Sequence, residues 1–236
     1  MNKPAFVSRS TILAVSVAAA VFATALPAAA EIGLSALSPG HLFISEVMPD
    51  PAKVSDTRGE WFEIFNTRPE PVNLVGLVVT SEGSTAQERF SVAMDALVPP
   101  NGFFVFARNA EATLNGGFTA NIAWGSTLSL GNAADYLKLE KPDGTLLAQI
   151  SWSTALSGAS LEVRGGTLPT IVAADLAPTP VGFAYGLGDR GTPGAMNSVD
   201  FGVSGIAPVP EPGTYALLAA GLAGLTLRQA RRRVVL

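Results

Sequence analysis

The sequence of 236 residues contains no cysteine and a single histidine, His41. The lack of thiols excludes disulfide scaffolds, cysteine nucleophiles and thiolate metal sites, and one imidazole excludes metal sites that need several. Charged residues are also scarce, at 14% of the chain, whereas a soluble domain has roughly 25%. The mean hydropathy is accordingly positive, at +0.35, and its meaning depends on where the apolar residues lie.

Charge divides the chain into three regions. Residues 1–30 carry a net charge of +2 and residues 210–236 a net charge of +3, whereas residues 31–209 carry a net charge of −9. Both cationic ends contain an apolar run, so the positive mean hydropathy is not evidence of a membrane-embedded middle. The acidic middle also argues against nucleic acid as a partner, because phosphate contacts require clustered Lys and Arg.

Residues 1–30 are predicted to be a signal peptide with an apolar helix. A short basic start is followed by an apolar run over 11–26. The small residues Ala28 and Ala30 suit the narrow subsites of a signal peptidase, so cleavage is predicted after Ala30. An uncleaved N-terminal anchor is the alternative to cleavage.

The C-terminal region, residues 209–236, contains an apolar run over 213–227 followed by a basic cluster. Fifteen residues span about 22 Å as a helix, which is short of the roughly 30 Å of a bilayer core. The run is therefore a marginal membrane helix. A buried amphipathic helix is the alternative, but the run has no polar face. The basic cluster is expected to stay cytoplasmic and act as a membrane stop; it comprises Arg228, Arg231, Arg232 and Arg233.

The order of Pro210-Glu211-Pro212, an apolar run and terminal arginines resembles the PEP-CTERM sorting signal. The resemblance implies a Gram-negative host with an exosortase, a membrane protease that would recognise Pro210, Glu211 and Pro212. It also implies a transient inner-membrane anchor and delivery to the cell envelope or the extracellular space. Such hosts commonly make exopolysaccharide and biofilm.

Between the two ends, short apolar runs alternate with clusters of Gly, Pro, Asn and Asp, a pattern typical of an all-β domain. One clear hairpin is predicted at Pro142-Asp143-Gly144, because Pro fixes φ and Gly accepts a positive φ. Nine short strands suit a β-sandwich or barrel. They are predicted at 42–47, 60–66, 74–80, 89–92, 102–107, 122–124, 136–140, 146–152 and 159–163.

Several of these segments resemble the bacterial lamin-tail domain. The resemblance implies an immunoglobulin-like β-sandwich over 42–197, preceded by an extension at 31–41 and followed by a linker at 198–208. The family has no established catalytic residues, so the resemblance implies none and no enzymatic activity is predicted. The segments are Leu42 to Pro51, Gly59 to Asn66, Val72 to Leu77, Val98 to Val105, Leu130 to Leu139 and Gly191 to Asn197.

The densest acidic cluster is Glu46, Asp50, Asp56, Glu60 and Glu63. If the first two strands pair, oxygens from this cluster could bind calcium, which takes six to eight oxygen ligands. The spacing fits no known calcium loop, and an odd separation places Glu60 and Glu63 on opposite faces of a strand. Solvated surface carboxylates, one of them paired with an arginine such as Arg58 or Arg89, are therefore expected, and no metal or other cofactor is predicted.

Two further residue types are candidates for chemistry. His41 could belong to a serine triad, but no Gly-x-Ser-x-Gly motif is present and a solvent-exposed role is expected. Trp61, Trp124 and Trp152 could stack on sugars, or could pack in the core. Since neighbouring strand residues point to opposite faces, either Trp61 or Phe62 is expected to lie away from the main core.

The sequence therefore predicts an exported, non-enzymatic protein of the cell surface or matrix, with a structural, adhesive or binding role. Its expected partners are signal peptidase and exosortase during processing, and exopolysaccharide or other surface proteins afterwards. A secreted hydrolase of the nuclease or phosphatase type is one alternative. A calcium-dependent polysaccharide-binding adhesin is the other.

Overall fold

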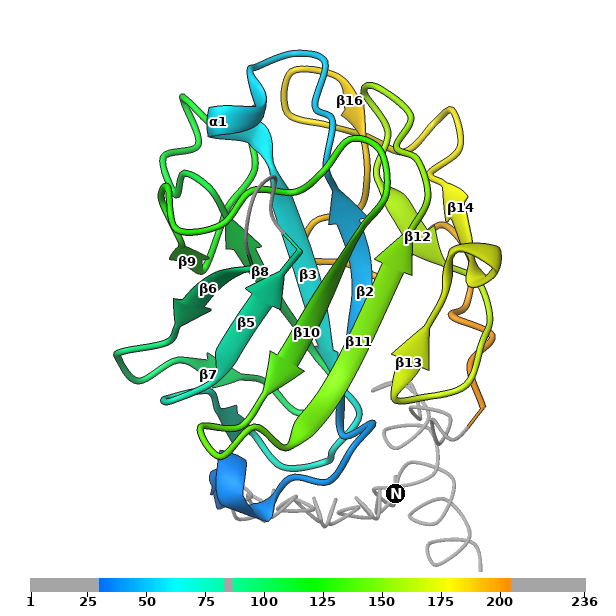
Figure 1. Ribbon diagram of the computed structural model, residues 1–236. Helices are drawn as coiled ribbons and strands as arrows, with labels where there is room; N and C mark the ends of the chain where they lie inside the picture. Colours follow the sequence, from blue (N-terminus) through cyan, green and yellow to red (C-terminus); the bar gives the residue numbers. More distant parts are fainter. Residues whose placement is uncertain (1–29, 83–86, 205–236) are drawn as a thin grey trace, which may run out of the picture.

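The computed structural model describes residues 30–82 and 87–204, and this part of the chain is almost entirely β-structure (Figure 1). Its helical content is one turn of α-helix, α1 (Asp56–Gly59), and the 3-10 turns η1 (Leu34–Ala36) and η2 (Ala173–Asp175). The predicted all-β class is confirmed. The predicted signal-peptide helix and C-terminal hydrophobic helix lie outside the described residues.

Two larger sheets form the body of the domain. The five-stranded sheet has the order β13-β11-β10-β5-β6, with β13 (Thr170–Ile171), β11 (Leu146–Trp152), β10 (Asp135–Glu140), β5 (Val78–Ser81) and β6 (Glu88–Ser91). The six-stranded sheet has the order β14-β12-β2-β3-β8-β9, with β14 (Leu176–Pro178), β12 (Leu161–Val163), β2 (Leu42–Met48), β3 (Trp61–Asn66), β8 (Phe103–Ala107) and β9 (Ile122–Ala123).

Two small sheets complete the described structure. One joins β1 (Ile32–Gly33), β4 (Val72–Asn73) and β7 (Leu97–Val98), and the other joins β15 (Ala184–Tyr185) to β16 (Asp189–Arg190). Pairing is mostly antiparallel, but β1 with β4, β8 with β9, and β11 with β13 are parallel. The sheets are therefore mixed at their margins.

The predicted hairpin at Pro142-Asp143-Gly144 joins β10 to β11. Gly144 has a φ of +86°, the left-handed conformation that favours glycine, and the two strands pair with Leu137 opposite Ile150. Residues along β10 alternate between buried and half-buried, with Leu137 and Leu139 buried. Period-two patterning therefore fixes which face of this strand enters the core.

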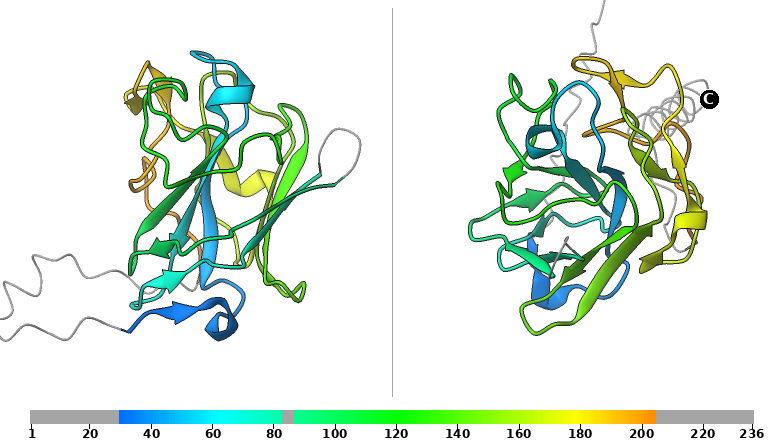
Figure 2. Two further views of the ribbon diagram at one scale, coloured as in Figure 1. Left: turned by 90° about the vertical axis from the view of Figure 1, so that its left-hand side faces the viewer. Right: turned by 45° about the horizontal axis from the view of Figure 1, so that its top comes forward.

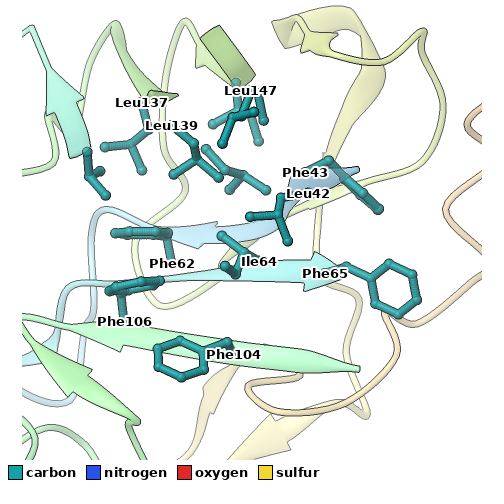
Figure 3. Close-up of a cluster of buried hydrophobic side chains, with 14 of the residues drawn as sticks. Leu42, Phe43, Phe62, Ile64, Phe65, Phe104, Phe106, Leu137, Leu139 and Leu147 are labelled. Atoms are coloured by element: carbon teal, nitrogen blue, oxygen red, sulfur yellow. The ribbon is translucent and has the colours of Figure 1, made fainter. Parts of the chain in front are cut away.

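The two larger sheets pack face to face around one hydrophobic core. Figure 3 shows leucines of the five-stranded sheet lying opposite aromatic and aliphatic side chains of the six-stranded sheet. Phe62 is central: its ring stacks on Phe106 at 4.8 Å and on Trp124 at 5.4 Å between ring centroids. Burial of such apolar surface is the main stabilising contribution to a fold of this kind. The facing residues include Leu137, Leu139, Leu147, Leu42, Ile64 and Phe104.

All nine predicted strands have counterparts in the structure, with ends shifted by a few residues at most positions. The largest shift is in the segment predicted as 74–80, where the strand β5 begins only at Val78. The prediction omitted the three-residue strand β14 and the two-residue strands β1, β4, β7, β13, β15 and β16. These segments are too short to show a period, and their pairing depends on partners distant in sequence.

The packed unit extends beyond residues 42–197. Leu34 and Leu37, which precede the first predicted strand, are buried in the main core. Phe201, which follows the predicted domain, lies 4.9 Å from Phe43 and 5.1 Å from Phe65 between ring centroids. Parts of the predicted extension and linker therefore belong to the folded domain.

A segment that we call the strap, residues 179–203, lies on the side of the six-stranded sheet that faces away from the main core. In the left view of Figure 2, the gold and orange strap lies on one side of β2 and β3, and the green strands of the five-stranded sheet lie on the other. Gly191 of the strap approaches Trp61 so closely that an added Cβ would lie 2.8 Å from the indole ring. The six-stranded sheet is thus covered on both faces.

Candidate functional site

The outer face of the six-stranded sheet, under the strap, carries a row of three buried glutamates. Glu162 of β12 lies opposite Glu46 of β2, and Glu46 lies opposite Glu63 of β3. All three side chains are fully buried, at 0% exposure. Like charges directly opposite each other on a sheet destabilise it, so this row needs compensating contacts.

A β-bulge places the central glutamate in the row. The pairing of β2 with β3 shifts between Ile44 and Glu46, which leaves Ser45 as an extra residue on β2. In a regular strand Glu46 would share the inner face with Ile44, because side chains two positions apart point the same way; the bulge turns Glu46 to the outer face instead. The bulge is thus the local device that buries a carboxyl group on the outer face.

Glu46 accepts hydrogen bonds from both the sheet and the strap. The hydroxyl of Thr192 donates to Oε2 at 2.6 Å, and the Thr192 amide lies 3.1 and 3.2 Å from the two oxygens. Thr179 donates to Oε1 at 3.2 Å, and the Ser160 hydroxyl is also a donor to Oε1. Three of the contacting groups belong to the strap, so Glu46 is one of its principal attachment points.

Glu63 is a second attachment point. Its Oε2 accepts a hydrogen bond from the Gly194 amide at 2.6 Å, and its Oε1 accepts one from the Ser45 hydroxyl at 2.7 Å. The amides of Thr192 and Gly194 in the strap therefore point toward the two adjacent glutamates.

Glu162 differs from its two neighbours because it has a cation. Arg164 forms a salt bridge with its Oε1 at 2.6 Å, and Ser198 of the strap donates its amide to Oε2 at 3.0 Å. Of the salt bridges in residues 30–82 and 87–204, none involves Glu46 or Glu63. Within that part of the chain, these two carboxyl groups are held by neutral donors.

Burial without a cation changes how the two carboxyl groups titrate. Burial raises the pKa of Glu46 to about 7, although hydrogen bonds from Ser160, Thr192 and Thr179 oppose this increase. Burial raises the pKa of Glu63 well above its ordinary value, and the neighbouring charge of Glu46 raises it further. At acid and near-neutral pH the pair therefore keeps at least one proton.

Other contacts fix the strap at either side of this row. Asp189 accepts hydrogen bonds from the amides of Ala52 at 3.3 Å and Lys53 at 3.1 Å. The indole N–H of Trp61 donates to the Tyr185 hydroxyl at 3.0 Å. Polar groups therefore determine the position of the strap at several points along its length.

The structure does not bring the five candidate calcium ligands together. Glu46 and Glu63 are adjacent and buried, whereas Asp50 accepts a hydrogen bond from Ser157 and Asp56 one from Asn132, both at half-buried positions. Glu60 pairs with Arg108 at 2.8 Å. The described residues contain no group of three or more His, Cys, Asp or Glu side chains arranged to hold a metal ion.

The expectation of solvated carboxylates is wrong for three of the five residues. Glu46, Glu60 and Glu63 are buried. Burial raises the pKa of Glu60 to about 7, although the Arg108 guanidinium acts to lower it. The expected arginine partners were Arg58 or Arg89, but Arg108 arrives from the end of β8, which only the strand order brings next to β3.

The tryptophans are core residues. Trp61, Trp124 and Trp152 are at most 3% exposed, so none presents a ring for sugar stacking. Trp61 lies in a separate small cluster on the outer face while Phe62 lies in the main core, which confirms that the two point to opposite faces. His41 is half-buried, and its Nδ1 accepts a hydrogen bond from the Ser38 amide at 3.1 Å.

Sequence reasoning missed the hydroxyl and amide groups that hold the glutamate row, because they lie more than a hundred residues from Glu46 along the chain. Ser160 and Thr192 give no motif by themselves. The sequence does contain one signal for this site: Glu63 lies between Phe62 and Ile64 in an otherwise apolar strand. A charged residue at such a position is buried only when it has a polar partner. That signal indicates a buried contact but not which segment supplies it.

The fold and this site define a class: a two-sheet β-domain whose second face is closed by a C-terminal strap. Residues 35–154 match the model of the lamin tail domain, and the chain belongs to that family. The strap and β12 lie beyond the matched residues. Residues 208–233 match the PEP-CTERM protein-sorting motif, which implies an exported, cell-surface protein that is processed by an exosortase.

A search of curated proteins found no match to this chain. Among the described residues, no helix is long and apolar enough to cross a membrane. The predicted membrane helix at 213–227, the processing residues Pro210, Glu211 and Pro212, and the arginine cluster lie outside the described residues.

Proposed function

We propose that this protein is a non-enzymatic structural or adhesive component of the cell surface or extracellular matrix of a Gram-negative bacterium. One immunoglobulin-like β-sandwich forms its exported part. The single observation that carries the proposal is the order of the two matches: a lamin tail domain at 35–154 precedes a PEP-CTERM sorting motif at 208–233. The net charge of −9 over residues 31–209 suits an exported module better than one that binds nucleic acid.

The placement of the acidic residues supports a structural role. The carboxyl groups of Glu46, Glu63 and Glu162 are buried and occupied by hydroxyl, amide or guanidinium donors. Asp50 and Asp56 lie apart from them. A general acid or base must reach the substrate within hydrogen-bond distance, and buried, occupied carboxyl groups do not present such a geometry.

The processing step can be tested with a Glu211→Ala variant of the full chain in its host. Because Pro210, Glu211 and Pro212 are proposed as the recognition residues, the wild type should lose its tail and leave the inner membrane. The variant should keep its tail and remain there. Mass spectrometry and cell fractionation measure both properties, and Glu111→Ala, the same change at an exposed loop position, serves as the control.

Identical mass and location for wild type and Glu211→Ala would contradict the processing role of the tail. The non-enzymatic assignment has its own test, which is an assay of the purified protein against DNA, phosphoesters and polysaccharide. We expect no turnover. Activity that is lost in Glu46→Gln, Glu60→Gln or Glu63→Gln would instead favour a secreted hydrolase.

A further inference from the structure

The strap has an unusual attachment to the domain. Over the glutamate row it contacts the sheet through N–H and O–H donors: Thr192 donates to Glu46, Gly194 to Glu63 and Ser198 to Glu162. These three strap residues thus bind three side-by-side carboxyl groups. The strength of the attachment depends on the charge state of the row.

Ionisation of the row has two opposing effects. A carboxylate accepts stronger hydrogen bonds than a neutral carboxyl group, but a buried charge without a cation loses its hydration. Glu162 is compensated by Arg164 at 2.6 Å, whereas Glu46 and Glu63 face each other across paired strands without a salt bridge in the described part of the chain. Two ionised carboxylates on directly paired residues repel each other. For this pair, the loss of hydration and the repulsion therefore outweigh the gain from stronger hydrogen bonds.

We propose that Glu46 and Glu63 form a proton-dependent clasp, which holds the strap on the outer face most tightly when both carboxyl groups are protonated and loosens it as they ionise.

Other titratable and charged groups face the pair from each packed element. Glu162 and Arg164 come from β12 and its end, and Tyr185 and Asp189 come from the strap. Burial raises the pKa of the Tyr185 hydroxyl, so this group stays neutral between pH 5 and pH 8. Arg164 is exposed and already bonded to Glu162, so within the glutamate row the groups with raised pKa values are Glu46 and Glu63. Glu60, whose pKa is also about 7, pairs with Arg108 outside the row.

The direction of the pH effect follows from linkage. Burial under the strap and between the strands raises the pKa of Glu46 from 4.5 to about 7, although the Thr192 and Thr179 donors of the strap act to lower it. The docked state therefore binds this proton more tightly than a state with the carboxyl group in water. Docking is therefore strongest below pH 4.5, and the contribution of Glu46 is lost as the pH rises through 7. Each pKa unit is a factor of ten, so the loss over the whole range is at most about 300-fold for Glu46 alone, the value reached when release returns its carboxyl group to water.

Release would lengthen the free chain before the sorting motif. The strap is attached as far as Phe201, and the motif match begins at 208. Freeing residues 179–203 would add about 80 Å of reach at roughly 3.3 Å per residue. This consequence rests on the proposed function: a loosened strap would present the motif to its processing enzyme, and a docked strap would keep it near the domain.

The clasp can be tested by amide hydrogen exchange on the full chain in detergent at pH 5, 6, 7 and 8, corrected for the intrinsic pH dependence of exchange. We expect protection of the Thr192 and Gly194 amides to fall by about 70-fold between pH 5 and 8, because part of the full change for Glu46 already occurs below pH 5. Protection of amides in β10 and β11 should change much less, because those strands lie in the other sheet. This wild-type measurement needs no variant.

Two variants sharpen the result. Glu46→Gln and Glu63→Gln, singly and together, remove the titration but keep the shape: the amide oxygen can accept from Thr192 or Gly194, and the amide nitrogen can donate to the Ser160 or Ser45 hydroxyl. The double variant should show strap protection that is independent of pH. Glu111→Gln, an exposed glutamate away from the row, should behave as the wild type.

Constant protection of Thr192 and Gly194 from pH 5 to 8 in the wild type would overturn the clasp. An equal loss of protection in β10 and β11 would also overturn it, because it would show unfolding of the whole domain. Neither result depends on sorting in the cell. Failure of the clasp is therefore distinguishable from failure of the proposed function, which the Glu211→Ala variant tests.

Discussion

On its inner face, the six-stranded sheet meets the five-stranded sheet through side chains such as Phe62 and Ile64, which need only shape and apolar surface. On its outer face, the same strands meet the strap partly through rings, where Phe201 packs on Phe43 and Phe65. The rest of that contact includes Glu46, Glu63 and Glu162, which need specific donors. Both faces exclude water. The difference indicates that the inner contact gives most of the stability, while the outer contact is specific in register and sensitive to pH.

The largest effect should come from the inner face. Phe62→Ala removes a ring that stacks on Phe106 and Trp124, and such a cavity costs about 3–5 kcal/mol of unfolding free energy. Urea denaturation measures this loss. Phe65→Ala, the same change on the opposite face of β3, is the matched control. It removes contact with Phe201 and should lower exchange protection in the strap first.

Equal loss of strap protection in Phe62→Ala and Phe65→Ala would show that the two faces are not separable. The inner and outer contacts of the six-stranded sheet would then not differ in stability, because the strap and the core would unfold as one cooperative unit.

The next effect concerns the paired glutamate at the entry to β3. Arg108→Met removes the guanidinium that lies 2.8 Å from Glu60, and an uncompensated buried charge costs about 3–5 kcal/mol. The pKa of Glu60, already about 7, should rise further, since the cation that lowers it is lost. The variant should therefore be strongly destabilised at pH 8 and much less at pH 5, where Glu60 is protonated. Thermal unfolding at both pH values measures the difference.

Glu60→Gln combined with Arg108→Met is the control for that prediction, because it removes the charge together with its partner. The double variant should recover most of the stability at pH 8. A pH-independent loss in Arg108→Met would mean that the arginine contributes by packing alone.

The smallest effect should come from Tyr185→Phe. It removes the acceptor of the Trp61 indole N–H, which lies 3.0 Å from the Tyr185 hydroxyl, but keeps the ring contacts with Trp61 and Phe118. The loss of one hydrogen bond at a buried donor costs about 1–2 kcal/mol. Differential scanning calorimetry at one pH measures it, and no change in melting temperature would show that the ring contacts alone fix this part of the strap.

Much of the fold is predictable from local patterns. Alternation in β10 and the Pro142-Asp143-Gly144 turn predict the hairpin correctly, because both depend on residues adjacent in sequence. The short strands and the strap were not predictable in this way. A two-residue strand has no period, and the partners of Glu46 at Ser160 and Thr192 are 114 and 146 residues away.

The sequence by itself determined the all-β class, the family and the sorting motif, because strand alternation, turn residues and ordered motifs are local properties of the chain. Only the tertiary structure decided that Glu46 and Glu63 are buried beside each other and that Thr192 and Gly194 bind them. The physical reason is that burial and hydrogen-bond partners depend on which distant segments meet. For these two carboxyl groups, that meeting also decides the pH at which they ionise.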